Sequence, residues 1–462
     1  MSELDRYLRS LSSFVQERRP NPWTAEPIDL YRHPSGFRCY YIPKPGFHQR
    51  FFALALPYGS AYRHFRTGAG DLRAILPGSA HFLEHCIFER ADEEGGQREG
   101  LMQALAALGC QSNAYTGHEF TVYYVRGSGA PLAQAAQLLT RAFFQAELSS
   151  QRIAAELPII QAELDMYADE PESRAWQRLF AALYKEQAVR HDIGGDREEL
   201  EQLRAEDLQA LHRSIYHPAQ VQATVSGDWS AGDLEELLSF LDGILSDFRS
   251  APGHLVQEYE RSFGQAPVQL EEEQNTGPEA VYWAQKKRVE QLPWLLDDLE
   301  RARENVSAQL LLDSLLGDSA PLYHELYQRG LINDSLQLRY QLERQYAHCT
   351  ASLDREGAAE ALAELRAELS AELGRLAAGQ PRYFRPELYE EQRKAAFGRF
   401  VRAFDSVERQ ALELLHLSLD GLDLEDYARA YREANWKRGL EALSFLQEPV
   451  DSVELRLLAG KA

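Results

Sequence analysis

The chain of 462 residues lacks several features that define common protein classes. Its four cysteines lie far apart and form no CxxC pair, which argues against a cysteine-based zinc site and against a disulfide framework. No stretch approaches the roughly 18–20 continuous apolar residues that span a bilayer. The N-terminus has neither a basic segment nor an apolar one, so no secretory signal is visible. We therefore expect a cytoplasmic protein that does not contact the membrane.

Basic residues are scarce relative to acidic ones. The 49 Lys and Arg against 71 Asp and Glu give a formal net charge of −22. An acidic protein repels nucleic acid, and no basic cluster stands out, so no nucleic-acid partner is expected. The acidic surplus serves either solubility or an acidic chamber that favours basic peptides, and the sequence leaves both interpretations open.

The chain is too long for one ordinary core, and its pattern predicts the same order of elements twice. The order is strand, strand, helix, helix, strand, strand, helix. In the first half the predicted elements are strands 37–42 and 51–56, a helix around 81–85, a helix at 101–108, strands 112–116 and 120–125, and a helix near 131–148. In the second half they are strands 268–270 and 281–284, helices 296–316 and 322–328, strands 336–340 and 351–353, and a long helix to about 378.

This repetition predicts an α+β fold of two related halves, each with an antiparallel or mixed sheet and helices packed on one face. Turn-forming residues cluster around 250–254 and again at 277–278, where we place the join. The predicted segments are a helical N-terminal extension at 1–24, a first half at 25–248, a linker at 249–278 and a second half at 279–462.

One pentapeptide carries most of the chemical information: His81-Phe82-Leu83-Glu84-His85. In a helix, the two histidines of H-x-x-E-H are one turn apart on the same face, so both can reach one metal ion. Glu84 beside them is placed to hold a proton near water rather than to bind the metal. The alternative is a surface helix with two unrelated histidines, and only further ligands can decide between them.

A catalytic zinc site needs a third protein ligand. The predicted helical stretch at 149–184 supplies two acids, Glu156 and Glu163, seven residues apart and hence on one face. They are either part of a metal site or a solvated acidic face. Pro158 lies between them and lacks a backbone donor, so the helix either begins close to Pro158 or is kinked there.

With both features in place, the chain resembles peptidase family M16, the pitrilysin-type inverzincins that include insulin-degrading enzymes and mitochondrial processing peptidases. In that family a distal Glu follows H-x-x-E-H by 75–80 residues, and Glu163 follows His85 by 78. The resemblance implies one Zn²⁺ per chain held by His81, His85 and Glu163, with Glu84 as general base and Glu156 in support. It further implies that peptide substrates bind at Asn113 and Ala114 on an edge strand, and at Phe88.

The second half departs from this pattern. Many active members carry an Arg and a Tyr near a Gly-Leu there, which bind the carbonyl under attack. Here Gly330-Leu331 is present, but Leu326 or Tyr327 stands where Arg is expected and Asn333 where Tyr is expected. A second donor to the oxyanion is therefore not identified, and His118 and Tyr115 are weaker candidates.

The resemblance predicts a zinc-dependent endopeptidase or oligopeptidase that acts on unfolded peptides. Family members build a closed chamber from four α+β units, and this chain holds two. We therefore expect a homodimer, or a heterodimer with an M16-like companion subunit. The alternative hypothesis is a non-catalytic scaffold or assembly subunit of the same fold, which would have no need to retain zinc.

Overall fold

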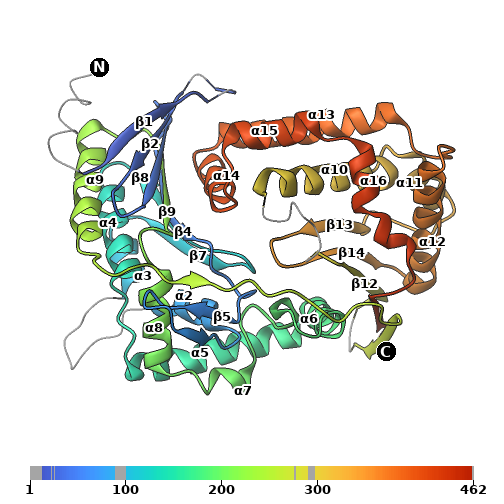
Figure 1. The fold of residues 1–462 in the computed structure, drawn as a ribbon, viewed down its shortest axis with the longest axis horizontal. Coiled ribbons are helices and arrows are strands. Elements are labelled where there is room, and N and C mark those ends of the chain that lie inside the picture. Colours follow the sequence, from blue (N-terminus) through green and yellow to red (C-terminus); the bar gives the residue numbers. More distant parts are fainter. Residues whose placement is uncertain are drawn as a thin grey trace. The chain divides into compact units, whose positions relative to one another are not determined.

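A computed structural model describes residues 13–459, apart from 22, 25, 89–99, 275–276 and 290–296 (Figure 1). The chain forms two compact units. Unit 1 comprises Met1–Leu164, Asp192–Val256 and Phe400–Leu424, and unit 2 comprises Asp165–His191, Gln257–Arg399 and Glu425–Ala462. Within the part of the chain that is described, no helix has the length and apolar content needed to cross a membrane.

Unit 1 is built on a seven-stranded mixed sheet with the order β1-β2-β3-β9-β4-β8-β7. Among its described strands, only β3 and β9 run parallel, and β7 forms one edge, paired antiparallel with β8. The strands are β1 (Val15–Arg19), β2 (Ile28–Arg32), β3 (Arg38–Pro43), β4 (Gln49–Leu56), β7 (Gln111–Thr116), β8 (Thr121–Ser128) and β9 (Gln222–Gly227). A small separate sheet consists of β5 (His64–Arg66), β6 (Leu72–Ala74) and β10 (His254–Leu255).

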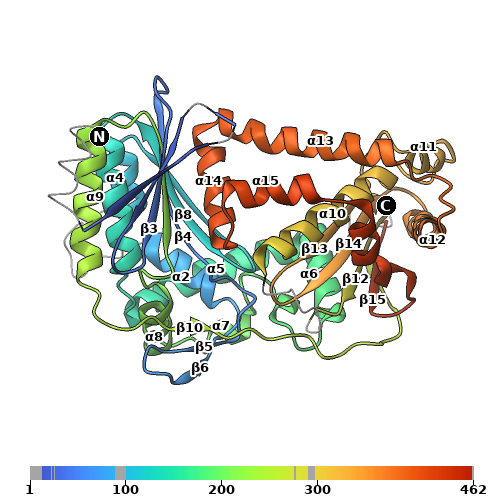
Figure 2. The same ribbon diagram turned by 45° about the horizontal axis from the view of Figure 1, so that its top comes forward.

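Helices cover both faces of the large sheet. Figures 1 and 2 show α4 (Pro131–Phe144) and α9 (Ala231–Ser246) on one face and α14 (Val407–Leu419) on the other. The last six residues of β4 form an uninterrupted apolar run, Phe51–Leu56, and all of them are buried. A strand of this composition needs cover on both faces. The second cover comes from α14, far along the chain.

The contacts of α14 are both apolar and polar. Leu414 and Leu415 are buried, and the helix packs on β4 and β9. The Gln410 amide donates to Ser226 Oγ of β9 at 2.7 Å, and Tyr40 OH of β3 lies 2.7 Å from Ser418 Oγ. These bonds satisfy the amide nitrogen of Gln410 and the hydroxyl of Ser418, both of which are buried, so α14 is an integral part of unit 1.

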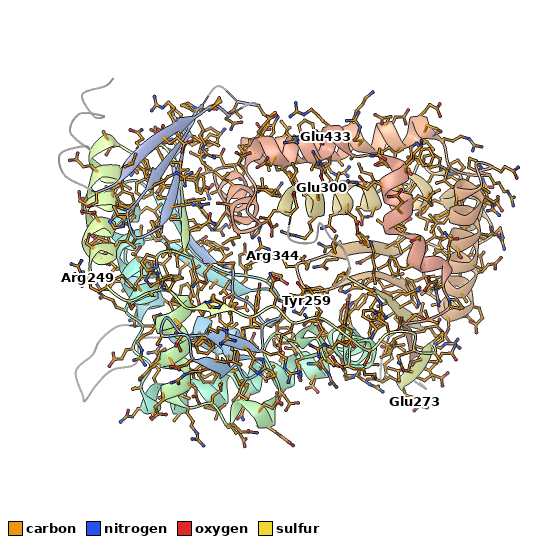
Figure 3. All side chains as sticks on the ribbon, in the orientation of Figure 1. Arg249, Tyr259, Glu273, Glu300, Arg344 and Glu433 are labelled. Carbon is orange, nitrogen blue, oxygen red and sulfur yellow. The ribbon has the colours of Figure 1, made fainter. Side chains whose placement is uncertain are left out.

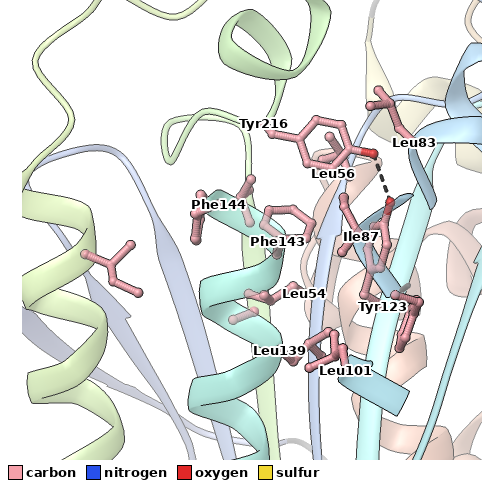
Figure 4. Close-up of a cluster of buried hydrophobic side chains, with 14 of the residues drawn as sticks. Leu54, Leu56, Leu83, Ile87, Leu101, Tyr123, Leu139, Phe143, Phe144 and Tyr216 are labelled. Atoms are coloured by element: carbon pink, nitrogen blue, oxygen red, sulfur yellow. Dashed lines mark hydrogen bonds between the residues drawn. The ribbon is translucent and has the colours of Figure 1, made fainter. Parts of the chain in front are cut away.

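The core of unit 1 lies between the sheet and the helices α2 (Ser79–Phe88), α4 and α8 (Ala205–Ile215). Figure 4 shows Leu83 and Ile87 of α2 within this cluster, beside the hydroxyl groups of Tyr123 and Tyr216, which are 2.9 Å apart. The other helices of unit 1 are α3 (Leu101–Ala107), α5 (Ser150–Asp169, which continues into unit 2) and α7 (Arg197–Leu200).

Unit 2 has a five-stranded sheet with the order β11-β15-β12-β14-β13. Its strands are β11 (Val268–Glu273), β12 (Ala280–Lys287), β13 (Gln337–Leu342), β14 (Ala347–Asp354) and β15 (Ser452–Leu458). Its helices are α6 (Pro171–Leu183), α10 (Asp298–Leu316), α11 (Pro321–Gln328), α12 (Ala358–Ala377), α13 (Pro386–Arg402), α15 (Leu424–Glu433) and α16 (Trp436–Ala442). Helix α6, from the N-terminal half of the chain, packs against β12 and β15.

An ion-pair cluster joins three helices of unit 2. Glu300 of α10 and Glu433 of α15, both labelled in Figure 3, each pair with Arg303, and Glu300 also accepts from Arg438 of α16 at 2.6 Å. The nearby guanidinium groups of Arg438 and Arg303 hold the pKa of Glu300 below its usual value, against the opposing effect of partial burial. The cluster therefore ties together helices from separate stretches of the chain.

The predicted α+β class with two halves is confirmed, and the predicted strands and helices overlap those observed. The prediction of helices on one face of the sheet was wrong for unit 1, because its apolar central strand β4 is covered on both faces, by α4 and by α14. The units nevertheless differ from the predicted continuous segments 25–248 and 279–462, because each takes one covering helix from the other half of the chain. In the stretch 1–24, the described part holds strand β1 instead of a helix, and residues 1–12 lie outside the described residues. The predicted linker 249–278 contains β10 and β11.

We predict that Leu415→Ala in α14 lowers the free energy of unfolding of unit 1 by about 2–5 kcal/mol, the usual cost of a cavity in a packed core. The matched change Glu408→Gln removes the partly exposed ion pair with Arg126 and should cost at most about 1 kcal/mol. Calorimetry of both variants measures the difference. Equal, small effects of the two substitutions would show that α14 is not needed for the stability of unit 1.

Candidate metal centre

The candidate site begins with the packing of α2. Phe82, Leu83 and Ile87 are buried, and the three residues of this helix that remain half-buried are His81, Glu84 and His85. The apolar side of the helix is held by the core of unit 1. Its three polar side chains therefore lie together on the side that faces the surface. The ring centroids of the two histidines are 4.6 Å apart.

Glu163 reaches this group from α5. Its Oε2 lies 3.2 Å from His85 Nε2 and 3.8 Å from His81 Nε2. The three side chains each offer one ligand atom, and these atoms lie within 4.8 Å of one another. Tetrahedral zinc with bonds of 2.0–2.1 Å keeps its ligand atoms about 3.3 Å apart. Two nitrogens and one carboxylate oxygen at these separations fit a zinc ion.

Burial and neighbouring groups shift the pKa of a histidine and of a carboxyl group in the site. Burial, aided by the neighbouring His85, lowers the pKa of His81 to about 4, so its imidazole is neutral and able to bind a metal near pH 7. Burial raises the pKa of Glu84 to about 7, against the lowering effect of a hydrogen bond from Thr116. A carboxyl group with a pKa near the working pH is suited to accept and return a proton.

The pocket around these residues has a volume of about 390 Å³ and lies wholly within unit 1. Its remaining lining comes from α2, α3, α5 and the edge strand β7, and consists of Phe88, Met102, Asn113, Ala114, Glu156 and Ile159. The structure thus brings together all of the predicted site residues. Met102 and Ile159, both substantially exposed, were not predicted, since no motif marks them.

Glu156 is buried two turns before Glu163. Its Oε1 lies 3.8 Å from Nη2 of Arg152, which also donates to the backbone oxygen of Cys86 at 3.0 Å. This contact links α5 to the end of α2. Helix α5 begins at Ser150 and continues through Pro158, so the predicted alternative of a helix beginning near Pro158 was wrong.

The two weaker candidates for an oxyanion donor are engaged elsewhere. Tyr115 OH lies 2.9 Å from His416 Nε2 of α14, and His118 Nδ1 lies 2.8 Å from Ser60 Oγ. In unit 2, Leu326 is fully buried, and the Asn333 amide donates to the backbone oxygen of Asp354 at 3.0 Å. Tyr115, His118 and Asn333 each make a hydrogen bond elsewhere, and Leu326 has no donor group. Tyr327, the other residue at the expected Arg position, is exposed.

Three glycines set the start of α2. A Cβ on Gly78 would lie 2.9 Å from the carbonyl carbon of Gly194 and closer still to its oxygen, and a Cβ on Gly195 would lie 2.7 Å from Gly78 Cα. Gly78 also has φ +81°, a backbone conformation that residues with a side chain rarely adopt. This backbone contact fixes the turn that precedes His81.

Two family profiles match the chain: "Insulinase (Peptidase family M16)" at residues 67–197 and "Peptidase M16 inactive domain" at residues 202–396. The Bacillus subtilis (strain 168) protein named uncharacterized zinc protease YmfH is 25% identical over 405 residues, which cover 85% of this chain and 87% of that protein. Relatives named as zinc proteases support a peptidase function with zinc as the cofactor.

Solved structures agree in fold. An M16-like chain from Alicyclobacillus acidocaldarius superposes with a TM-score of 0.78 at 21% identity, covering 94% of this chain and 99% of that one. Pitrilysin superposes with a TM-score of 0.72 at 16% identity, with 97% of this chain matched to 47% of pitrilysin.

We predict that Gly78→Ala weakens zinc binding by about 10–100-fold, the range typical of residues that orient metal ligands. The clash with Gly194 would displace the turn before His81. Gly109→Ala is the matched control, because Gly109 also has positive φ (+70°) but no atom lies within 4 Å of its Cβ position. Competitive zinc titration compares the two. If both variants bind zinc like the wild type, the glycine contact does not position the ligands.

Proposed function

Because the chain belongs to peptidase family M16, we propose that it is a zinc-dependent endopeptidase or oligopeptidase that hydrolyses unfolded peptides. The observation that carries this proposal is the convergence of His81, His85 and Glu163, with Glu84 beside them, in one pocket next to an edge strand. The donor set suits zinc, and three protein ligands leave a position open for water, as in catalytic zinc sites.

Each residue has a distinct task in this proposal. His81, His85 and Glu163 would hold one zinc ion, which when bound supplies Lewis-acid polarisation of the peptide carbonyl and activation of water. Glu84 would take the proton from the attacking water and pass it to the leaving amine. Glu156 would support the site through Arg152, which contacts the backbone of α2.

The edge strand β7 would receive the substrate. Its inner edge pairs with β8, and it is the last of the described strands of the sheet, so an extended peptide can add to its outer edge by backbone hydrogen bonds. Asn113 and Ala114 of this strand line the pocket together with Phe88. Recognition through the backbone requires an extended, unfolded substrate and imposes little sequence preference.

The second donor to the oxyanion would come from a companion subunit. This inference is supported by the residues at the positions where active relatives are expected to carry Arg and Tyr: Leu326 or Tyr327 stands at the first, and Asn333 at the second. A homodimer or a heterodimer with an M16-like chain would complete a closed chamber. The four cysteines are buried free thiols, in keeping with the cytoplasmic location that we propose.

We predict that Glu84→Gln retains one zinc per chain and loses at least about 10² in kcat, because the general base is removed while the ligands remain. His85→Ala and Glu163→Gln should lose zinc. Asp169→Asn changes an exposed carboxylate on the same helix as Glu163. This variant is the control and should retain both zinc and activity. Metal analysis and a quenched-peptide assay measure these outcomes. Full activity in Glu84→Gln would exclude the general-base role, and activity that survives complete zinc removal would refute the proposed function.

We further predict that the isolated chain turns over about 10²–10³-fold more slowly than the assembled enzyme, the typical cost of one missing oxyanion donor. Light scattering gives the oligomeric state, and the rate per chain is measured across concentrations and after adding proteins that copurify from the native cell. A fully active monomer would contradict the shared-chamber proposal while leaving the zinc peptidase intact.

A further inference from the structure

Side chains of the edge strand β7 make hydrogen bonds on both faces of the sheet. Side chains alternate along a strand, so Thr116 and Tyr115 point to opposite sides of the sheet. Thr116 Oγ1 donates to Glu84 Oε2 of α2 at 2.5 Å, whereas Tyr115 OH lies 2.9 Å from His416 Nε2 of α14. The strand that borders the pocket therefore also makes a direct bond to the carboxylate in it.

We propose that Thr116 is a positioning residue for Glu84, an inference that rests on the proposed peptidase function. A hydroxyl-to-carboxylate bond of this length belongs to the strong class of hydrogen bonds, and it engages one oxygen of the carboxylate. It prevents the carboxylate from rotating about its last torsion, which is otherwise soft. Oε1 is then left as the oxygen that faces the attacking water.

The placement of Thr116 makes this support rigid. Its β-branched side chain has few rotamers, and its backbone is paired with Thr121 across the β7–β8 ladder. Glu84 is thus held from two sides, by its own helix and by a strand of the sheet. Proton transfer is sensitive to displacements well below 1 Å, so this restraint acts on the chemical step.

The same strand also serves as the reference for the substrate. Ala114 and Thr116 are two residues apart and share a face. A peptide added to the edge of β7 takes its register from the strand backbone, and Glu84 takes its orientation from Thr116 on that backbone. The carbonyl under attack and the base are therefore aligned against one element.

The test compares three single substitutions in the full, zinc-loaded chain, assayed with the partner that gives it full activity. Thr116→Val removes the hydroxyl and keeps the shape, and Thr116→Ser keeps the hydroxyl. Thr121→Val is the matched control, since Thr121 lies directly opposite in the same hairpin and donates to the backbone oxygen of Tyr58 at 2.7 Å. The readouts are kcat, KM, zinc affinity, melting temperature and the position of Glu84 in crystal structures.

We expect Thr116→Val to lower kcat by about 10–100-fold with KM and zinc affinity unchanged, and to show the Glu84 carboxylate rotated or in two positions. Thr116→Ser should restore kcat, and Thr121→Val should lower the melting temperature without changing kcat. Wild-type kcat in Thr116→Val, or an undisturbed Glu84 in its structure, would overturn the proposal. If the wild type itself cleaves no peptide, the proposed function fails, and the crystal structures still decide whether Thr116 orients Glu84.

Discussion

The burial of the apolar side of α2 is the constraint on which the candidate site depends. A helix of ten residues is marginal by itself, and this one is stabilised by packing Phe82, Leu83 and Ile87 into the core of unit 1. Once these side chains are buried, the 3.6-residue period leaves His81, Glu84 and His85 together on the other side. The polar residues are placed by their apolar neighbours, and the glycine contact at Gly78 sets where the helix starts.

A second constraint explains why each unit includes a helix from the other half of the chain. The central strands β4 and β12 are buried along most of their length, which requires apolar cover on both faces of each sheet. Unit 1 receives α14 from the C-terminal half, and unit 2 receives α6 from the N-terminal half. Because each unit needs a segment from the other half, the folding of the two halves is coupled. Helix α14 also contacts Tyr115 on the edge strand β7. A helix from the C-terminal half of the chain therefore packs next to the strand that lines the candidate site.

Much of this arrangement could be read from the sequence. The spacing of His81 and His85 predicted that they share one helix face, and the resemblance to peptidase family M16 implied that Glu163 joins them. The repeated order of strands and helices predicted two related halves. The apolar run 51–56 predicted a strand, and helices were expected on one face of each sheet. Strand β4 is instead buried on both faces, and no local pattern says which helix provides the second cover. For that reason the predicted boundaries were continuous. Thr116 stood in the predicted edge strand, and the two-residue alternation places it on the same face as Ala114. Its bond to Glu84 depends on the packing of α2 against β7, which is a tertiary contact.

The location of the site residues in the chain implies that zinc binding and catalytic turnover have different requirements. The three candidate ligands, the general base and the hydroxyl that holds it all lie in unit 1, on α2, α5 and β7. Within the proposed function, one chain is therefore sufficient to bind the metal and to orient the base. Within the proposed function, stabilisation of the oxyanion is different, because the expected donor positions hold Leu326 or Tyr327, and Asn333, which is hydrogen-bonded to Asp354. If a companion subunit supplies the second donor, as proposed, metal content reports on the single chain and the rate of cleavage reports on the assembly. A chain that binds zinc but turns over slowly would then be incomplete instead of inactive.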